Sequence, residues 1–160
     1  MKIEGTHTIE APRERVFAAL TDPAVLQRCI PGCEQMEKSG DNRYNAKLTA
    51  GVGPVKGVFT ATVSLSELVP PEHYKLIVEG KGQPGFVNGT GDLNLKDAGN
   101  ATEIQYTGEV NVGGLIASVG QRMIQSTAKL LAGRFFKALE SEVKTETKGI
   151  TETYAVDPKG

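Results

Sequence analysis

The chain changes its hydrophobic period once, from a long run of two-residue alternation to a single helical stripe. Between about Glu34 and Gly114, apolar and polar residues alternate in short segments separated by turn residues. After Gly114 apolar residues recur at helical spacing, and no proline interrupts the chain before Pro158. Short links between alternating segments are typical of antiparallel hairpins, and a long amphipathic helix must bury its stripe. The chain therefore predicts an α+β domain whose long C-terminal helix packs on the dry face of an antiparallel sheet.

Local signals give the order of the elements. Residues 2–10 alternate like a strand, Pro12 and Asp22-Pro23 mark two short helices, and Pro31-Gly32 ends the second one. Six further strands and one helix, from about Leu115 to about Lys144, complete the order. We expect residues 1–145 to form one domain and residues 146–160 to be a polar, poorly ordered tail.

Composition excludes several classes of protein. A net charge of −1 argues against nucleic-acid binding, which usually requires a basic face. The start of the chain has no apolar core of a signal peptide, and no run is long enough to span a membrane. Cys29 and Cys33 are expected to be reduced thiols, and the chain predicts no metal site and no cofactor. The expected location is the cytoplasm, with membrane contact at most peripheral at the inner face of the cell membrane.

Small residues at inward positions of the predicted strands leave two interpretations open. These positions are Ala46, Ala50, Ala61, Gly89, Gly91 and Gly108. They remove core volume, which favours a ligand-sized apolar hollow under the helix. Equally, the glycines can serve bulges and strand bending, with the helix collapsed onto the sheet.

Several segments, in order, resemble the CoxG family of carbon monoxide dehydrogenase subunits, which is part of the START-like, or SRPBCC, superfamily. Together they span about residues 1–145. The Pro31-Gly32-Cys33 turn and the Gly120-Gln121-Arg122 stretch carry most of this resemblance. The matching stretches are Ile9-Glu10-Ala11-Pro12 with Val16-Phe17, Ile30 to Glu34, Gly53 to Phe59, Gly85 to Leu95, Gly120 to Ile124, and Phe135-Phe136.

The resemblance implies a helix-grip fold: a curved seven-stranded sheet wrapped around the long helix, with an apolar cavity between them. It also implies an accessory protein for a molybdenum-containing CO dehydrogenase or related hydroxylase. Such proteins are linked to membrane attachment of the enzyme and to lipophilic quinones. Longer members carry a C-terminal extension that associates with membrane, whereas the tail here is short and polar. The expected partners are thus a lipophilic molecule and a molybdenum hydroxylase, and the chain leaves a homo-oligomer open.

The expected cavity is described by ten wall positions and two polar positions at its mouth. Gln121 and Arg122 would lie at the mouth, where a polar group can hold a carbonyl or carboxylate; a solvated helix face is the competing interpretation. The wall positions, each also explicable as plain core packing, are Phe17, Leu26, Ile30, Phe59, Ala61, Phe86, Tyr106, Met123, Ile124 and Thr127.

No catalytic set can be assembled from the sequence. His7 is expected on the inner face of the first strand and His73 in a solvated turn, and neither has a neighbouring nucleophile. The favoured function is therefore non-catalytic binding of a quinone- or lipid-like molecule. Two alternatives stay open, namely an enzyme of the polyketide cyclase or hydrolase type and a protein-interaction module without a ligand.

Overall fold

Seven strands, two short helices and one long helix make up the computed structural model, which describes the backbone of residues 1–156 and the side chains of residues 1–144. The elements, in chain order, are β1 (Lys2–Ile9), α1 (Arg13–Leu20), α2 (Pro23–Cys29), β2 (Cys33–Gly40), β3 (Arg43–Val52), β4 (Val55–Val69), β5 (His73–Gly82), β6 (Gly85–Asp97), β7 (Thr102–Gly113), the 3₁₀ helix η1 (Leu115–Val119) and α3 (Gln121–Val156). The α+β prediction and its order of elements are confirmed.

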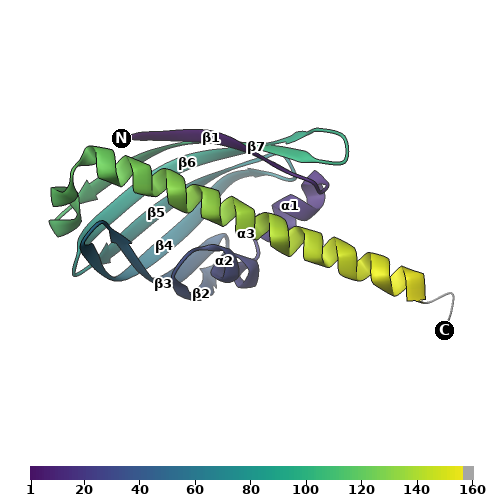
Figure 1. Ribbon diagram of the computed structural model, residues 1–160, viewed down its shortest axis with the longest axis horizontal. Coiled ribbons are helices and arrows are strands. Elements are labelled where there is room, and N and C mark those ends of the chain that lie inside the picture. The colour runs from purple at the N-terminus through teal and green to yellow at the C-terminus, as the bar shows by residue number, and fades with distance from the viewer. Residues whose placement is uncertain (157–160) are drawn as a thin grey trace.

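The strands form one curved antiparallel sheet in the order β1-β7-β6-β5-β4-β3-β2. Neighbours from β2 to β7 are joined by hairpins, and β1 crosses to pair with β7, placing Lys2 opposite Glu109. Alternation along each strand sends one set of side chains toward α3 and the other toward solvent. The long helix crosses the concave face of the sheet diagonally (Figure 1).

The two short helices begin at the prolines that mark them in the sequence. Pro12 precedes α1 in an extended conformation, and Pro23 occupies the first turn of α2. The carboxylate of Asp22 accepts a hydrogen bond of 2.9 Å from the backbone N–H of Ala24, which caps α2. Both helices pack against the middle of α3, where Arg28 of α2 forms a 2.8 Å ion pair with Glu142.

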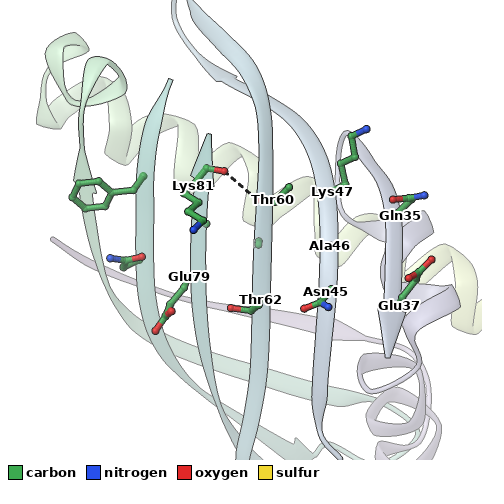
Figure 2. A pocket seen from close by; sticks show the side chains of 13 residues that line it. Gln35, Glu37, Asn45, Ala46, Lys47, Thr60, Thr62, Glu79 and Lys81 are labelled. Atoms are coloured by element: carbon green, nitrogen blue, oxygen red, sulfur yellow. Dashed lines mark hydrogen bonds between the residues drawn. The ribbon is translucent and has the colours of Figure 1, made fainter. Parts of the chain in front are cut away.

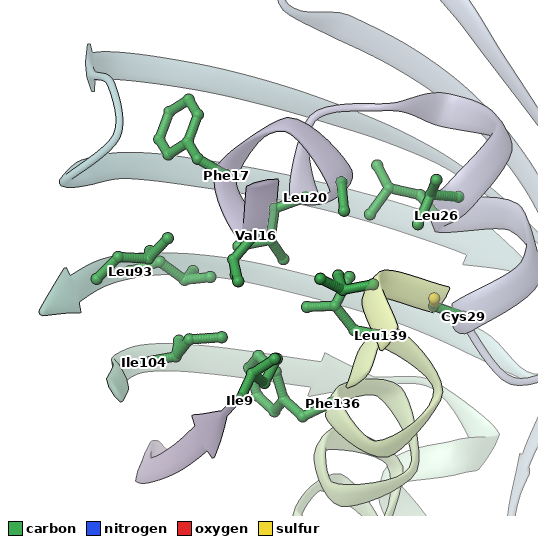
Figure 3. Packing of buried hydrophobic residues seen from close by; sticks show 14 of the residues in the cluster. Ile9, Val16, Phe17, Leu20, Leu26, Cys29, Leu93, Ile104, Phe136 and Leu139 are labelled. Atoms are coloured by element: carbon green, nitrogen blue, oxygen red, sulfur yellow. The ribbon is translucent and has the colours of Figure 1, made fainter. Parts of the chain in front are cut away.

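The main core lies where α1, α2 and α3 meet the sheet (Figure 3). Ile9 of β1, Ile104 of β7 and Leu139 of α3 are completely buried there. This packing closes one end of the space between sheet and helix with apolar side chains. The opposite end, near η1, has a smaller cluster built around Val52, Phe59, Ile116 and Ile124.

Both predicted ends of the long helix are corrected. The segment from Leu115 to Val119 is a separate 3₁₀ helix, and Gly120 (φ +97°) breaks it from α3, which begins at Gln121. Glycine adopts a positive φ at little cost, so the backbone can break at Gly120. The apolar residues keep their helical spacing on both sides of this break, and the spacing therefore does not reveal it. At the other end the helical backbone continues to Val156, beyond the predicted end near Lys144. The last part of the predicted tail, residues 157–160, lies outside the described residues.

Candidate functional site

An inner apolar chamber of about 340 Å³ lies between the middle of the sheet and the centre of α3. Strands β4 to β7 supply its floor, α2 and the residue that follows it supply Leu26 and Ile30, and α3 supplies its roof. The inward positions Gly91 and Gly108 contribute no side chain, which leaves room above β6 and β7. Its aromatic lining residues are Tyr74, Tyr106, Phe135 and Phe136.

An outer apolar chamber of about 350 Å³ lies next to it, toward η1 and the start of α3. Its walls are mostly aliphatic and come from β3 to β7, from η1 and from α3. Small residues lower the floor here too, since Ala50, Gly51, Ala61 and Gly80 line this chamber. The helical side is formed by Ile116 of η1 and by Ile124, Thr127, Ala128 and Leu131 of α3.

The small inward positions predicted from the sequence divide into two groups. Four of them line a chamber, namely Ala50, Ala61, Gly91 and Gly108, whereas Ala46 and Gly89 line neither. Ala46 is instead buried in the main core. At these four positions, under the middle and start of α3, the structure favours the first of the two interpretations, in which small residues leave room for a hollow.

The two chambers share Ile3, Val78, Val110 and Ala128 as lining residues. They are therefore adjacent parts of one apolar space that follows the axis of α3. Every lining side chain of both chambers is aliphatic, aromatic, a thioether or hydroxyl-bearing, or is absent at a glycine. Such a lining suits a molecule that is largely apolar and has few groups requiring hydrogen bonds.

Seven of the ten predicted wall residues line this apolar space. Leu26, Ile30 and Tyr106 line the inner chamber, and the other four, Phe59, Ala61, Ile124 and Thr127, line the outer one. Sequence reasoning missed the four shared residues and Tyr74. Each of the strand residues among them occupied an alternating inward position, so periodicity was the signal that could have found them.

Phe86 is the clearest correction among the predicted wall residues. Because Val87 faces inward, the period of two turns Phe86 to the outer face of the sheet, where its side chain is 43% exposed and its ring lies against Gly113. Met123 is also 43% exposed, and its sulfur lies beside Gly53 in the β3–β4 turn rather than in a chamber. A third residue, Phe17, is buried in the core, edge-to-face with Tyr74 at a centroid distance of 5.6 Å, and lines neither chamber.

The two predicted mouth residues lie at the first turn of α3. Gln121 and Arg122 are exposed, and neither lines a chamber. Their role at a cavity mouth stays a prediction. The outer chamber does approach this end of the molecule, since the nearby Ile124 lines it.

A larger hollow, of about 670 Å³, lies on the outer face of the sheet across β2 to β6. Figure 2 shows its labelled side chains on the side of the sheet away from α3, which passes behind. Its lining includes Glu37, Lys47, Glu79 and Lys81 together with amides and threonine hydroxyls. Charged and amide groups of this kind are well hydrated in water, so this surface is poorly matched to an apolar ligand.

Neither histidine lines a chamber. His7 of β1 stacks on Phe136 at 5.6 Å, and its Nε2 is 4.0 Å from Glu140 of α3. His73, predicted in a solvated turn, instead begins β5, with its Nδ1 3.1 Å from the carbonyl oxygen of Leu93 and its Nε2 3.8 Å from Asp92. Within residues 1–144 no group of three or more His, Cys, Asp or Glu side chains is arranged to hold a metal ion.

Cys29 and Cys33 are free thiols, as predicted. Burial, followed by the charge of Glu142, raises the pKa of Cys29 to about 11, and burial raises the pKa of Cys33 as well. The thiolate is the reactive form, so a raised pKa suppresses alkylation at ordinary pH.

We expect iodoacetamide at pH 8 to leave Cys29 unmodified in the folded protein and to label both thiols in urea. The raised pKa also has a consequence for stability. The folded protein favours the protonated Cys29 thiol. The resulting contribution to the free energy of unfolding is fully present below about pH 8.5, the pKa of a free thiol, and is lost as the pH rises through about 11. Mass spectrometry of the labelled peptides measures the rate at which iodoacetamide modifies each cysteine. Equal labelling of Cys29 in the folded and unfolded protein would contradict its placement in the core.

An antiparallel sheet gripping one long helix over an apolar space defines the helix-grip, START-like class of proteins. Solved structures agree: the chain shares this fold with a START superfamily protein from Mycobacterium smegmatis (15% identity, TM-score 0.68, covering 90% of this chain and 97% of that one). It also shares it with the Zhui aromatase/cyclase from Streptomyces sp. R1128 (15% identity, TM-score 0.71, covering 92% and 95%).

Within that class the chain belongs to the CoxG family of carbon monoxide dehydrogenase subunits, whose family model matches residues 5–144. A conserved protein from Geobacillus kaustophilus is 38% identical, with a TM-score of 0.87 over 91% of this chain and 96% of that one. No protein of curated function matches the chain significantly. Family and fold together support a ligand-binding or accessory role. Among the helices of the described residues, none is long and apolar enough to cross a membrane.

Proposed function

We propose that the protein binds a lipophilic, quinone- or lipid-like molecule in the two chambers, without catalysing its conversion. The observation that carries this proposal is the pair of adjoining apolar chambers between the sheet and α3. Burial of apolar ligand surface supplies about 25 cal/mol per Å². A ligand filling both chambers would therefore gain most of its affinity without any charged contact.

The lining also supports binding rather than catalysis. General acid–base chemistry requires a titratable group near neutral pH within hydrogen-bond reach of the substrate. The groups that line the chambers are hydrocarbon, thioether, threonine hydroxyl and tyrosine phenol. The cyclase named above shares the fold with this chain at 15% identity, which is no guide to its reaction.

Membership in the CoxG family extends the proposal to the protein's partner. The family description refers to a subunit of carbon monoxide dehydrogenase. We place the protein as an accessory to such a molybdenum enzyme or a related hydroxylase, working in the cytoplasm or peripherally at the inner membrane face. In that setting its bound molecule would be one that the enzyme uses or that the membrane supplies.

Native mass spectrometry of gently purified protein, followed by organic extraction, tests the proposal. We expect a mass shift from a retained apolar compound, or a shift when a quinone with an apolar tail is added to the empty protein. Ligand binding should also raise the unfolding temperature, because it stabilises only the folded state. An unshifted mass with every quinone and lipid tested, combined with co-purification of a large enzyme, would favour the protein-interaction module instead.

A further inference from the structure

The exposed side of α3 carries positive charge over most of its described length. From Gln121 to Leu139 the helix has four basic residues and no acidic one. The whole chain has one more acidic than basic residue, so this excess of positive charge is local. The four side chains, all exposed, are those of Arg122, Lys129, Arg134 and Lys137.

The spacing of these four cations places them on one side of the helix. With about 100° between successive residues, they fall within an arc of about 140° and along a length of about 22 Å. The opposite side of α3 is buried against the sheet through Ile124, Phe136 and Leu139. Figure 1 shows α3 lying outermost on the concave side of the sheet. We call the outward side, from Arg122 to Lys137, the basic face.

The cations of the basic face have no acidic partners. Within residues 1–144 none of the four forms an ion pair. By contrast Lys144, further along the same helix, lies 3.4 Å from Glu140 and 3.9 Å from Glu10. A single exposed lysine is usually only solvated, but a row of unneutralised cations creates a positive potential that attracts an anionic partner.

Two large apolar side chains lie among these cations. Met123 is 43% exposed and Leu130 is 55% exposed, and both fall within the same arc of the helix. A cationic helix face that also exposes apolar side chains is typical of helices that lie in the plane of an anionic membrane surface. There the charged heads reach the phosphates, while aliphatic side chains and stems enter the headgroup layer.

We propose that the basic face is a docking surface for an anionic lipid bilayer, on which α3 lies parallel to the membrane plane. This inference rests on the proposed function, since a lipophilic ligand is stored in membranes rather than in water. The attachment is shallow and largely electrostatic, because the other side of α3 is buried in the protein's own core. Since α3 is also the roof of both chambers, docking brings the roof against the source of the ligand.

Sedimentation with phosphatidylcholine vesicles, with and without phosphatidylglycerol, tests the docking surface. We expect binding to the anionic vesicles alone, weakened when the salt concentration rises from about 0.1 M to about 0.5 M. Lys129→Gln combined with Lys137→Gln should weaken binding about 25-fold, because each basic residue near an anionic surface contributes about fivefold. The matched control is Lys47→Gln combined with Lys81→Gln, which removes two exposed charges from the outer face of the sheet and should change binding less than about twofold.

A fluorescent reporter separates a bilayer from an acidic protein partner. The chain has no tryptophan, so Leu130→Trp introduces a single indole on the basic face. Its emission should shift to shorter wavelength on anionic vesicles and be quenched by brominated lipid. Val58→Trp is the control, since Val58 of β4 is 45% exposed and its neighbour Phe59 lines the outer chamber, which turns Val58 to the outer face. That emission should not change.

Equal binding to both kinds of vesicle, or equal weakening by the two lysine pairs, would overturn the inference. Binding of an acidic protein through the basic face, without vesicle binding, would overturn it as well and assign the face to a protein partner. Native mass spectrometry keeps the proposed function separate. A quinone bound by protein that does not bind vesicles would overturn the docking surface alone, whereas vesicle binding by protein that binds no quinone or lipid in its chambers would contradict the proposed function alone.

Discussion

Replacing Ala128 with phenylalanine should weaken ligand binding by about tenfold to 100-fold without harming the fold. Ala128 lies on α3 where the two chambers meet, and it is one of the four residues that line both. A phenyl ring at this point occupies the space through which a long ligand would pass. Displacing or overpacking such a ring costs about 1–3 kcal/mol, which corresponds to the expected loss of affinity.

The stability of the same variant separates a filled cavity from a damaged protein. Filling apolar space should raise the free energy of unfolding by about 1 kcal/mol, measured by urea titration of the empty protein. The control is Ser126→Phe, which adds the same ring to an exposed position of α3. That control should bind ligand normally. Undiminished binding by Ala128→Phe would show that the ligand binds outside the chambers.

Replacing Gly32 with alanine should destabilise the protein by about 2–5 kcal/mol, the largest effect that we expect from adding a single methyl group. Gly32 connects α2 to β2 with φ +77°, and its carbonyl oxygen accepts a 2.9 Å hydrogen bond from the backbone N–H of Thr49 in β3. A Cβ at this position would overlap the carbonyl oxygen of Thr49. Because that oxygen is part of the backbone of the sheet, the neighbour cannot move aside cheaply.

Gly99 offers a control with the same backbone conformation but open surroundings. Its φ is +81°, and no atom outside its own chain neighbours lies within 4 Å of the position that a Cβ would take. Gly99→Ala should therefore cost only the conformational strain, about 1–2 kcal/mol. Equal losses in the two variants, measured by urea unfolding, would show that the contact with Thr49 contributes nothing. A loss larger in Gly32→Ala would explain the glycine of the Pro31-Gly32-Cys33 turn.

The fold could be predicted because one face of every strand and one stripe of α3 are buried. Burial on one face produces the period of two before Gly114 and the helical period after it, and both are visible without coordinates. The break at Gly120 could not be predicted in this way. An apolar stripe indicates which side chains face the sheet. The break depends instead on the backbone dihedrals of Gly120, and a glycine in the sequence does not show whether its φ is positive or negative.

Predicted wall residues that keep the strand period, such as Phe59 and Tyr106, line a chamber, whereas Phe86 departs from that period and does not. Its neighbour Val87 occupies the inward position, and the structure turns Phe86 outward. Met123 lies one residue from the stripe that contains Ile124.

The position of β1 in the sheet has a consequence for the order in which the protein assembles. Synthesis delivers β1 first, but its partner is β7, so the register that sets Lys2 opposite Glu109 must wait until most of the chain exists. The helix that covers the concave face is delivered last. During translation the sheet therefore passes through a stage with an unpaired edge and an uncovered apolar face, the kind of intermediate most exposed to aggregation. A lipophilic molecule present at that stage would reach the chambers before α3 closes over them.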